Sequence, residues 1–175
     1  MMHLFEFVEF ATKQHDDVCN QKYDRRLPYS CHLEFVASQA MRFKHLLNQS
    51  NNDVPHAAMG CWGHDLIEDA RLTYNDIKDK VGVEVAEIIY ACTEVKGRNR
   101  DARHSVEYYA DLNANRLAVF VKLCDIMANV KYSILTNSSM YEKHKKEHAK
   151  TLKYLYDDHQ EFKPMFDHLT KLFAL

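Results

Sequence analysis

The chain contains 175 residues, of which 46% are hydrophobic, and its formal net charge is −2. A chain of this length suits one domain with a full core, and the hydrophobic fraction argues against disorder. The small negative charge lacks the basic footprint of a protein that binds duplex nucleic acid, so we expect no nucleic-acid polymer as a partner.

The pattern of apolar residues is helical almost throughout, and the low content of Gly (4) and Pro (3) also favours helices over a loop-rich β fold. Helices are predicted, in chain order, over residues 3–20, 31–47, from Pro55 into 62–69, 74–80, 83–95, 116–136, 140–159 and 162–174. No repeat, low-complexity tract or linker is visible. The sequence therefore predicts an all-α fold with a single domain over residues 1–175.

Local signals set several of the helix boundaries. Pro28 disfavours helix at Leu27 and so separates the first two predicted helices. Thr73, with Asp76 three residues later, resembles a capping box at the start of a helix. Residues 96–103 are expected to form a basic loop that contains one Gly.

Residues 116–136 are predicted to form one long buried helix. The run 117–121 could be a strand by composition alone, but the pattern continues at helical spacing beyond it. Lys122, Asp125 and Asn129 are separated by three and four residues, so they share one face of this otherwise apolar helix. Because an unpaired buried carboxylate is costly, this polar face indicates a lined site.

The five cysteines are widely spaced and include no C-x-x-C pair. A disulfide framework or a zinc knuckle is therefore not expected, and reduced thiols fit a cytoplasmic location. The first residues show no basic segment followed by an apolar one, and no apolar run approaches transmembrane length. We expect a cytoplasmic protein without a membrane partner.

The most informative segment of the chain is residues 62–69, which include His64, Asp65, Glu68 and Asp69. On a single helix these four side chains would share a sector of about 140°. Buried charge is costly unless it is paired or bound to a metal. An acidic sector inside an apolar helix therefore predicts a metal site.

His32, at the start of an earlier helix, and Asp125 extend this set to two imidazoles and two carboxylates, together with His64 and Asp65. The mixed N/O set suits a borderline divalent ion such as Mn²⁺, Fe²⁺, Co²⁺ or Zn²⁺ better than Ca²⁺ or Mg²⁺. Four protein ligands leave open positions on a six-coordinate ion for water and substrate. Taken alone, the His64-Asp65 pair could instead interact with backbone N–H groups at a helix start, and His32 could be a packed histidine.

The order His … His-Asp … Asp resembles the HD superfamily of metal-dependent phosphohydrolases. Within it, His-Asp-x-x-Glu-Asp (residues 64–69) and Lys-Leu-x-Asp-x-x-x-Asn (residues 122–129) resemble the hydrolase domain of the RelA/SpoT alarmone enzymes. Residues 23–32, which lead through Pro-Tyr to the first histidine, and residues 73–93 are also similar to that family. The resemblance spans roughly residues 4–136.

This resemblance implies a helical HD fold and removal of pyrophosphate from a guanosine tetra- or pentaphosphate, with Mn²⁺ as the expected metal. It makes Glu68 and Asp69 the pair that orients and deprotonates water. The metal ligands that it implies are His32, His64, Asp65 and Asp125. The positions that it places near the nucleotide or its phosphates are Lys22, Tyr29, Lys122 and Asn129.

The chain departs from the pattern of that family at three places. Gln21 stands where a basic residue is expected, and the stretch between the two histidine ligands is longer than usual. Cys124 and residues 126–128 (Ile-Met-Ala) flank Asp125 in place of the usual small residue and Arg-Leu-His. These changes spare the ligand set and concern the substrate.

Hydrolysis at a phosphoryl group requires a Lewis acid, a lowered water pKa and cationic clamps. A divalent ion would supply the first two, and Glu68, four residues after His64, could accept the proton. Lys22, Lys122 and the basic loop 96–103 are candidates for the clamps, although such a loop can also be a solvated connector.

Two further patterns have simpler interpretations. Residues 144–148 (His-Lys-Lys-Glu-His) formally match the H-x-x-E-H motif of zinc peptidases, but their charged neighbours predict a wet helix face. The aromatic residues between 154 and 166 are most simply core, and the alternatives are a cover over the site or a homo-oligomer contact.

The sequence thus favours a metal-dependent phosphohydrolase whose partner is a small phosphorylated nucleotide, first of all guanosine 3′,5′-bis(diphosphate). The alternatives are a nucleotide phosphatase or other phosphoesterase on the same scaffold, and a non-catalytic nucleotide-sensing module. Glu68 and Asp69 favour an enzyme over a sensor, because a pure binder needs no water-activating carboxylates.

Overall fold

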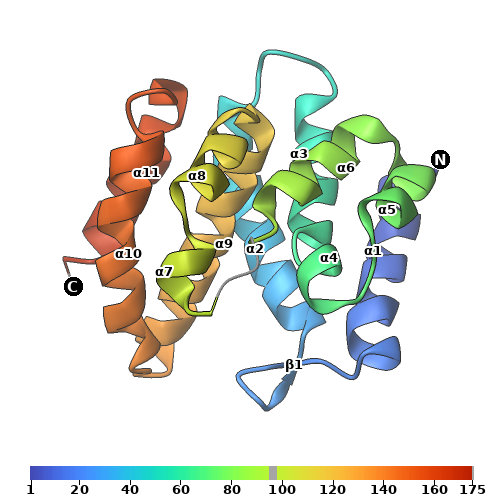
Figure 1. Cartoon of the computed structure of the whole chain (residues 1–175), viewed down its shortest axis with the longest axis horizontal. Helices are drawn as coiled ribbons and strands as arrows, with labels where there is room; N and C mark the ends of the chain where they lie inside the picture. The colour runs from blue at the N-terminus through green and yellow to red at the C-terminus, as the bar shows by residue number, and fades with distance from the viewer. Residues whose placement is uncertain (95–97, 175) are drawn as a thin grey trace.

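The computed structural model describes residues 1–94 and 98–174, without the side chains at positions 100 and 101 (Figure 1). The α-helices are α1 (Leu4–Lys13), α2 (Ser30–Phe43), α3 (Asp53–Gly63), α4 (Leu66–Asp69), α5 (Tyr74–Val81), α6 (Val83–Cys92), α7 (Arg100–Arg103), α8 (Val106–Asn113), α9 (Arg116–Leu135), α10 (Met140–Leu155) and α11 (Lys163–Leu172). The shorter elements are the π-helix η1 (Gln14–Val18), the 3₁₀ turns η2 (Lys44–Leu46) and η3 (Gln160–Phe162), and the strands β1 (Lys22–Tyr23) and β2 (Leu27–Pro28). The predicted all-α class is confirmed.

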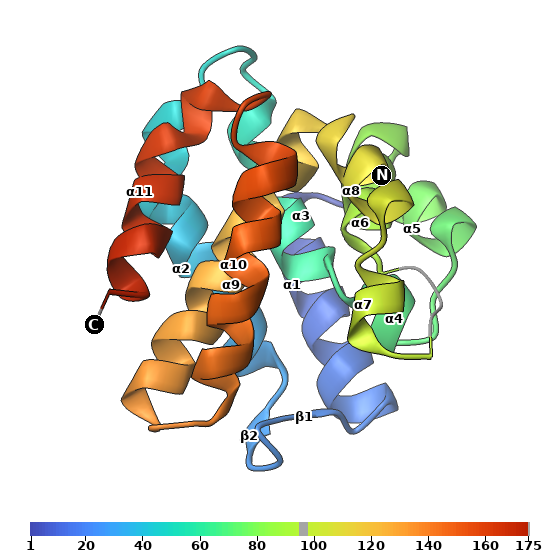
Figure 2. The ribbon, with the colours of Figure 1, turned by 60° about the vertical axis from the view of Figure 1, so that its left-hand side comes forward.

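The long helix α9 forms the centre of the fold. It is apolar on almost every side, and α2, α3, α6, α8, α10 and α11 all pack against it. Asn115 begins the helix, because its side chain accepts a hydrogen bond from the Ala118 amide at 3.1 Å. Figures 1 and 2 place α10 and α11 beside α9, on the side away from α1 and α5. Of the polar residues of α9, Asp125 is buried, and Lys122 and Asn129 are half-buried.

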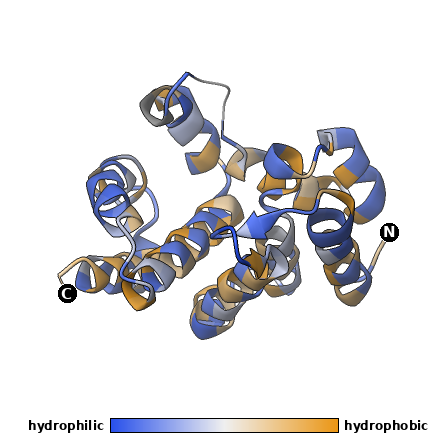
Figure 3. Ribbon diagram, turned by 90° about the horizontal axis from the view of Figure 1, so that it is seen from below, coloured by the Kyte–Doolittle hydropathy of each residue, from blue (hydrophilic) through white to orange (hydrophobic). Residues whose placement is uncertain are grey.

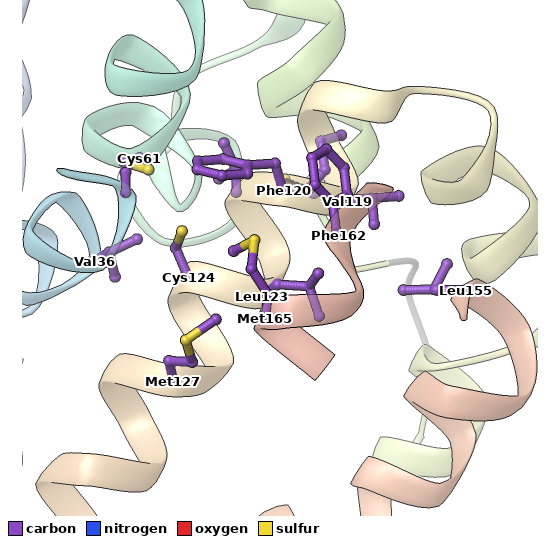
Figure 4. Close-up of a cluster of buried hydrophobic side chains, with 14 of the residues drawn as sticks. Val36, Cys61, Val119, Phe120, Leu123, Cys124, Met127, Leu155, Phe162 and Met165 are labelled. Carbon is purple, nitrogen blue, oxygen red and sulfur yellow. Dashed lines mark hydrogen bonds between the residues drawn. The ribbon is translucent and has the colours of Figure 1, made fainter. Parts of the chain in front are cut away.

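The core consists of two clusters of buried side chains. The larger surrounds α9 and includes Phe120, Leu123, Phe162 and Met165 (Figure 4). The smaller one joins α1, α5 and α6 with the beginning of α2, around Phe7. Most helices mix hydrophobic and hydrophilic residues, as expected for elements that bury one face (Figure 3).

A glycine lets α3 approach its neighbours closely. A Cβ atom at Gly60 would lie 2.7 Å from Ile88 Cγ2 on α6 and 2.9 Å from Val121 Cγ2 on α9. Distances this short are not tolerated unless these side chains, or the helices that carry them, shift. Gly60 thus fixes the position of the helix that ends next to His64.

Some predicted boundaries were wrong. The stretch 3–20 is α-helical only to Lys13 and continues as the π-helix η1. The break after it holds a small antiparallel hairpin, in which Lys22 pairs with Pro28 and Tyr23 with Leu27. Its turn has positive φ at both central residues, Asp24 and Arg25, as in the type I′ turns of tight hairpins.

The helix α8 was missed between the basic loop and α9. Its N-terminus is nevertheless marked, because Ser105 accepts a hydrogen bond from the Tyr108 amide. Across the described part of the chain, no helix combines the length and the apolar character that a membrane span needs.

Candidate metal centre

Four side chains from three separate segments converge in the interior. His32 comes from α2, His64 and Asp65 from the junction of α3 and α4, and Asp125 from α9. His32 and His64 are each 2% exposed and Asp125 is 6% exposed. The ligand atoms of His32, His64 and Asp125 all lie within 4.8 Å of one another.

The distances between these atoms are close to those around a shared ion, and two of them, 3.6 and 3.7 Å, are slightly longer. His32 Nε2 lies 3.3 Å from His64 Nε2 and 3.3 Å from Asp125 Oδ1, and His64 Nε2 lies 3.7 Å from the same oxygen. Asp65 Oδ2 completes the set at 2.9 Å from His64 Nε2 and 3.6 Å from His32 Nε2. Neighbouring ligands about 2.1 Å from one ion are about 3.0–3.4 Å apart in octahedral or tetrahedral geometry. The donor set therefore suits a divalent cation.

The backbone fixes the tautomer of one ligand. His64 Nδ1 donates to the carbonyl oxygen of Cys61, one helical turn earlier, at 2.9 Å. The lone pair of the neutral ring is then on Nε2, the atom that faces the other three ligands. This orientation of the imidazole is the one that metal binding needs.

Asp125 is held by two neighbours on its own helix face. Lys122 Nζ donates to Oδ2 at 3.0 Å and Asn129 Nδ2 donates to Oδ1 at 2.6 Å. Burial opposes ionisation, but Lys122 and the two histidines hold the pKa of Asp125 well below its ordinary value. The face of α9 predicted to be polar thus keeps Asp125 charged and oriented.

The hairpin brings Tyr23 over the site. Its ring stacks on His32 with centroids 4.9 Å apart, and its hydroxyl donates to Asn129 Oδ1 at 3.0 Å. Tyr132 on α9 contacts the same ring and binds Asp24 at the hairpin turn. Sequence reasoning missed Tyr23, because a two-residue strand carries no periodic signal.

Asp65 and the histidines form a tightly coupled group. Burial disfavours the charged carboxylate, but His64 and His32 hold the pKa of Asp65 well below its ordinary value. Burial likewise disfavours protonated imidazoles, yet the two carboxylates raise the pKa of His32 and, further, of His64. In the absence of an ion, protons therefore take the place of the missing positive charge.

Residues 62–69 do not form the single helix that was predicted. The helix α3 ends at Gly63, Asp65 adopts φ −101° and ψ 1°, and the one-turn helix α4 begins at Leu66. His64 and Asp65 therefore lie at the break, whereas Glu68 and Asp69 lie on α4. At this break, the ligand atoms of both residues lie within 3.6 Å of His32 Nε2 and of each other.

Glu68 and Asp69 lie at the exposed rim of this centre. Glu68 Oε2 accepts a hydrogen bond from the Glu94 amide at 3.2 Å. Partial burial and the Glu94 carboxylate raise the pKa of Glu68 to about 7. Burial and then Asp65 also raise the pKa of Asp69. Glu94 was not predicted, although it lies at the end of a predicted helix.

The two other candidates for substrate contact, Tyr29 and Lys22, differ in their surroundings. Tyr29 donates its hydroxyl to Asp65 Oδ2 at 2.5 Å and lies 3.4 Å from Asp69 Oδ2. Lys22 is exposed on β1. The structure therefore places Tyr29, Lys122 and Asn129 at the centre and Lys22 at the surface beside it.

A pocket adjoins the centre between α8, α9 and α10. It offers ≈ 40 Å³ of space to water-sized groups and is lined by His104, Tyr108, Tyr109, Lys122, Asp125, Ile126, Asn129, His144, Glu147, His148, Thr151 and Leu155. A second, more open hollow of ≈ 240 Å³ lies next to the hairpin and shares Asn129 and His144 with the first. Asn129 thus lies where the two hollows meet beside Asp125.

The H-x-x-E-H segment is less wet than predicted. His144 and His148 are each only 8% exposed, because this face of α10 packs toward α8 and α9. His148 Nε2 lies 3.1 Å from Thr170 Oγ1 on α11. The contact with Thr170 on α11 therefore accounts for the burial of His148 without a metal.

The basic loop is only partly covered by the structure. Lys96 lies outside the described residues, and the side chain of Arg100 is also outside them. Arg98 is exposed, and Arg103 Nε lies 3.2 Å from Glu94 Oε2. His104 contacts the other oxygen of Glu94 at 2.5 Å. In the described part of this loop, Arg103 and His104 therefore hold Glu94, the neighbour of Glu68.

A solved structure with the same fold is that of a metazoan ortholog of SpoT, described as a protein that hydrolyzes ppGpp and plays a role in starvation responses. The two chains are 17% identical, with a TM-score of 0.70 over 96% of this chain and 93% of that chain. No protein-family profile and no curated protein sequence matches this chain. The structural likeness confirms the predicted HD-type helical fold.

Proposed function

We propose that this chain is a metal-dependent phosphohydrolase of the HD type that acts on a small phosphorylated nucleotide. The observation that carries the proposal is the convergence of two imidazoles and two carboxylates, with a carboxylate of raised pKa at the rim. The first substrate that we propose is guanosine 3′,5′-bis(diphosphate), cleaved at its 3′-pyrophosphate. The likeness to a protein described as hydrolysing ppGpp supports this choice.

His32, His64, Asp65 and Asp125 would hold the cation, and Mn²⁺ is our first choice because the mixed donor set suits a borderline ion. When bound, a divalent ion supplies Lewis acidity that lowers the pKa of water and offsets phosphoryl charge. The neutral tautomer of His64 and the ionised state of Asp125 prepare this set for an ion. Cys61, Tyr29 and Lys122 hold His64, Asp65 and Asp125, respectively, by hydrogen bonds.

Glu68 would act as the general base. A pKa of about 7 keeps a large fraction of the carboxylate ionised near neutral pH and still basic enough to accept a proton from water. The water oxygen forms a bond to phosphorus, the bond from phosphorus to the ribose 3′-oxygen breaks, and that oxygen leaves with a proton. The products are the nucleoside 5′-diphosphate and pyrophosphate. Asp69 would orient the attacking water beside Glu68.

The substrate would lie across the two hollows that share Asn129 and His144. The narrow hollow offers space for about three waters, which suits a phosphoryl group better than a nucleobase. The wider hollow beside Tyr23 and Tyr132 offers aromatic surface for the rest of the nucleotide. We propose Tyr29, Lys122 and Asn129 as residues near the phosphates, and Lys22 as a cation at the edge.

The same proposal includes a single domain over residues 1–175 and a cytoplasmic location.

A panel of nucleotides incubated with the Mn²⁺-loaded protein tests this function, with the products separated by chromatography. The proposal predicts pyrophosphate release from guanosine 3′,5′-bis(diphosphate). If the protein hydrolyses only nucleoside monophosphates, it is a nucleotide phosphatase, and the proposed substrate is wrong. Nucleotide binding without turnover, in protein that binds the metal, would contradict the enzyme and indicate a sensor.

A further inference from the structure

A chain of hydrogen bonds runs from the buried residue His15 to the carboxylate Asp69. His15 Nδ1 lies 2.6 Å from Gln21 Oε1, and Gln21 Nε2 donates to Asp69 Oδ2 at 2.8 Å. His15 is 0% exposed and its ring stacks on Tyr29 with centroids 4.7 Å apart. Tyr29 in turn binds Asp65. Gln21 thus occupies a defined place beside the candidate base and the metal ligands.

The donors and acceptors in this chain of hydrogen bonds can be assigned by starting from Asp69. The Asp69 carboxylate accepts hydrogen bonds, so the amide nitrogen of Gln21 faces it and the amide oxygen faces His15. Since that oxygen can only accept, His15 must carry its proton on Nδ1. Its Nε2 is buried and has no hydrogen-bond partner among the described residues, which fits a neutral ring. The Nδ1–H form is therefore a specific prediction of this geometry.

The local backbone brings Gln21 back onto His15. Asn20 adopts a positive φ of 47°, a conformation that Asn tolerates better than most residues, and the Gln21 amide donates to the His15 carbonyl at 2.9 Å. The π-helix η1 also holds the end of α4, because Gln14 Nε2 donates to the Ala70 carbonyl at 3.1 Å. Short π-helical segments often occur at functional sites.

The helix α4 needs this support. It contains a single turn, so its own hydrogen bonds cannot fix the directions of Glu68 and Asp69. Asp69 is exposed to solvent at the rim and has only two protein donors near it in the described chain, Gln21 and the more distant Tyr29 hydroxyl. An exposed carboxylate without such contacts would sample several rotamers.

We propose that Gln21 and His15 are positioning residues that fix the Asp69 carboxylate relative to the metal ligands. This proposal rests on the proposed function of Asp69 in orienting water. Gln21 performs the task with a neutral amide, so it aligns the carboxylate without adding a positive charge to the site. His15 sets the direction of that amide from the buried side.

The first test reads the His15 ring by ¹H–¹⁵N correlation NMR in the folded wild-type protein. The proposal predicts a neutral imidazole with its proton on Nδ1, the less common tautomer of free histidine. In Gln21→Met, which keeps the length of the side chain but removes both amide groups, this resonance should shift. A His15 ring with its proton on Nε2 would overturn the assignment and with it the proposal.

The second test compares turnover in the Mn²⁺-loaded protein. We expect Gln21→Met to lower kcat by about 10- to 100-fold, while KM and the Mn²⁺ dissociation constant change less than about threefold. The matched control is Gln39→Met, which also removes a glutamine hydrogen bond, to Lys131, but lies outside the site. Unchanged kcat in Gln21→Met, or an equal loss in the control, would overturn the proposal.

A double-mutant cycle tests whether the two residues act together. His15→Phe keeps a ring against Tyr29 but removes the donor to Gln21. If the hydrogen-bond chain acts as a unit, the double variant His15→Phe/Gln21→Met should lose no more kcat than the more damaged of the two single variants. If the fold-losses in kcat of the two single variants multiply in the double variant, the residues act separately, which would contradict the proposal. A wild-type protein that hydrolyses no nucleotide would end the proposed function instead, while the NMR result still decides the hydrogen-bond chain.

Discussion

Neighbouring carboxylates in residues 65–69 acquire different tasks from their surroundings. Asp65 lies against two imidazoles, which outweigh its burial and hold its pKa low, so it suits a cation ligand. Glu68 lies near another carboxylate, Glu94, and its pKa is raised to about 7. Groups whose environments push their pKa values apart divide into ligand and acid–base roles. The sequence shows the acids, but only the fold shows which neighbour each of them has.

Substitution of Glu68 by Gln should remove turnover while the metal stays bound. The amide keeps the shape of the side chain but cannot accept a proton, so we expect kcat to fall by about 10²- to 10⁴-fold. Metal content and steady-state hydrolysis measure the two effects. The control Glu84→Gln changes an exposed carboxylate on α6 and should be silent. Full activity in Glu68→Gln would remove this residue from the mechanism.

The pH dependence of hydrolysis should report the raised pKa of Glu68. The base must be ionised, so kcat/KM should rise with pH up to about 7 and then level off. Glu94→Gln removes the like charge that favours the protonated form, and the rising limb should therefore move to lower pH. If kcat/KM of Glu94→Gln rises over the same pH range as that of the wild type, Glu94 does not raise the pKa of Glu68.

Individual elements differ in how far the sequence predicts them. The helix α9 was predicted because its pattern persists over many turns. The hairpin at 22–28 and the end of α3 at Gly63 were not, since both depend on contacts with distant parts of the chain. The four candidate ligands were singled out from their residue types and from the resemblance to the HD superfamily. Their partners Tyr23, Gln21 and Glu94 were not, because no local pattern joins them to the site.

The close approach of α3 to α6 and α9 can be tested at Gly60. Gly60→Ala would press a methyl group against Ile88 and Val121, so we expect a loss of about 1–3 kcal/mol in the free energy of unfolding. Because the same shift moves His64, Mn²⁺ affinity should fall as well. Chemical denaturation and metal titration measure both quantities, with His56→Ala one turn earlier in α3 as the control. Unchanged stability would show that the helices are not tightly packed here.

At the scale of the whole molecule, the candidate centre joins α2, the α3–α4 junction and α9. These segments lie far apart in the sequence, and α10 and α11 also pack against α9. An ion held by all three would stabilise the native state, by about 2.7 kcal/mol at a concentration 100 times its dissociation constant. Metal binding and global stability should therefore be linked.

This linkage should depend on pH with a defined sign. The pKa values of His32 and His64 in the metal-free fold lie above the ordinary value of 6.5. Their contribution to the free energy of unfolding is therefore complete below pH 6.5 and is lost as pH rises through the raised values. Asp65 and Asp125 have lowered pKa values, and their contribution is lost only as pH falls below 3.8. The metal replaces the protons on the imidazoles, so its binding strengthens as pH rises.

We therefore expect the Mn²⁺-induced increase in Tm to be larger at about pH 8 than at about pH 6. Thermal unfolding at both pH values, with and without the ion, measures this difference. An increase that shrinks with rising pH would show that the two histidines do not bind the ion.

The central claim is that His32, His64, Asp65 and Asp125 hold one divalent ion. Calorimetric titration of the metal-free protein with Mn²⁺ tests it most directly, with Asp125→Asn as the variant and Asp111→Asn, on the exposed side of α8, as the control. We predict one Mn²⁺ per chain in the wild type and in the control, and at least 10-fold weaker binding, about 1.4 kcal/mol or more, in folded Asp125→Asn. No binding to the wild type, or equal binding to Asp125→Asn, would contradict the claim.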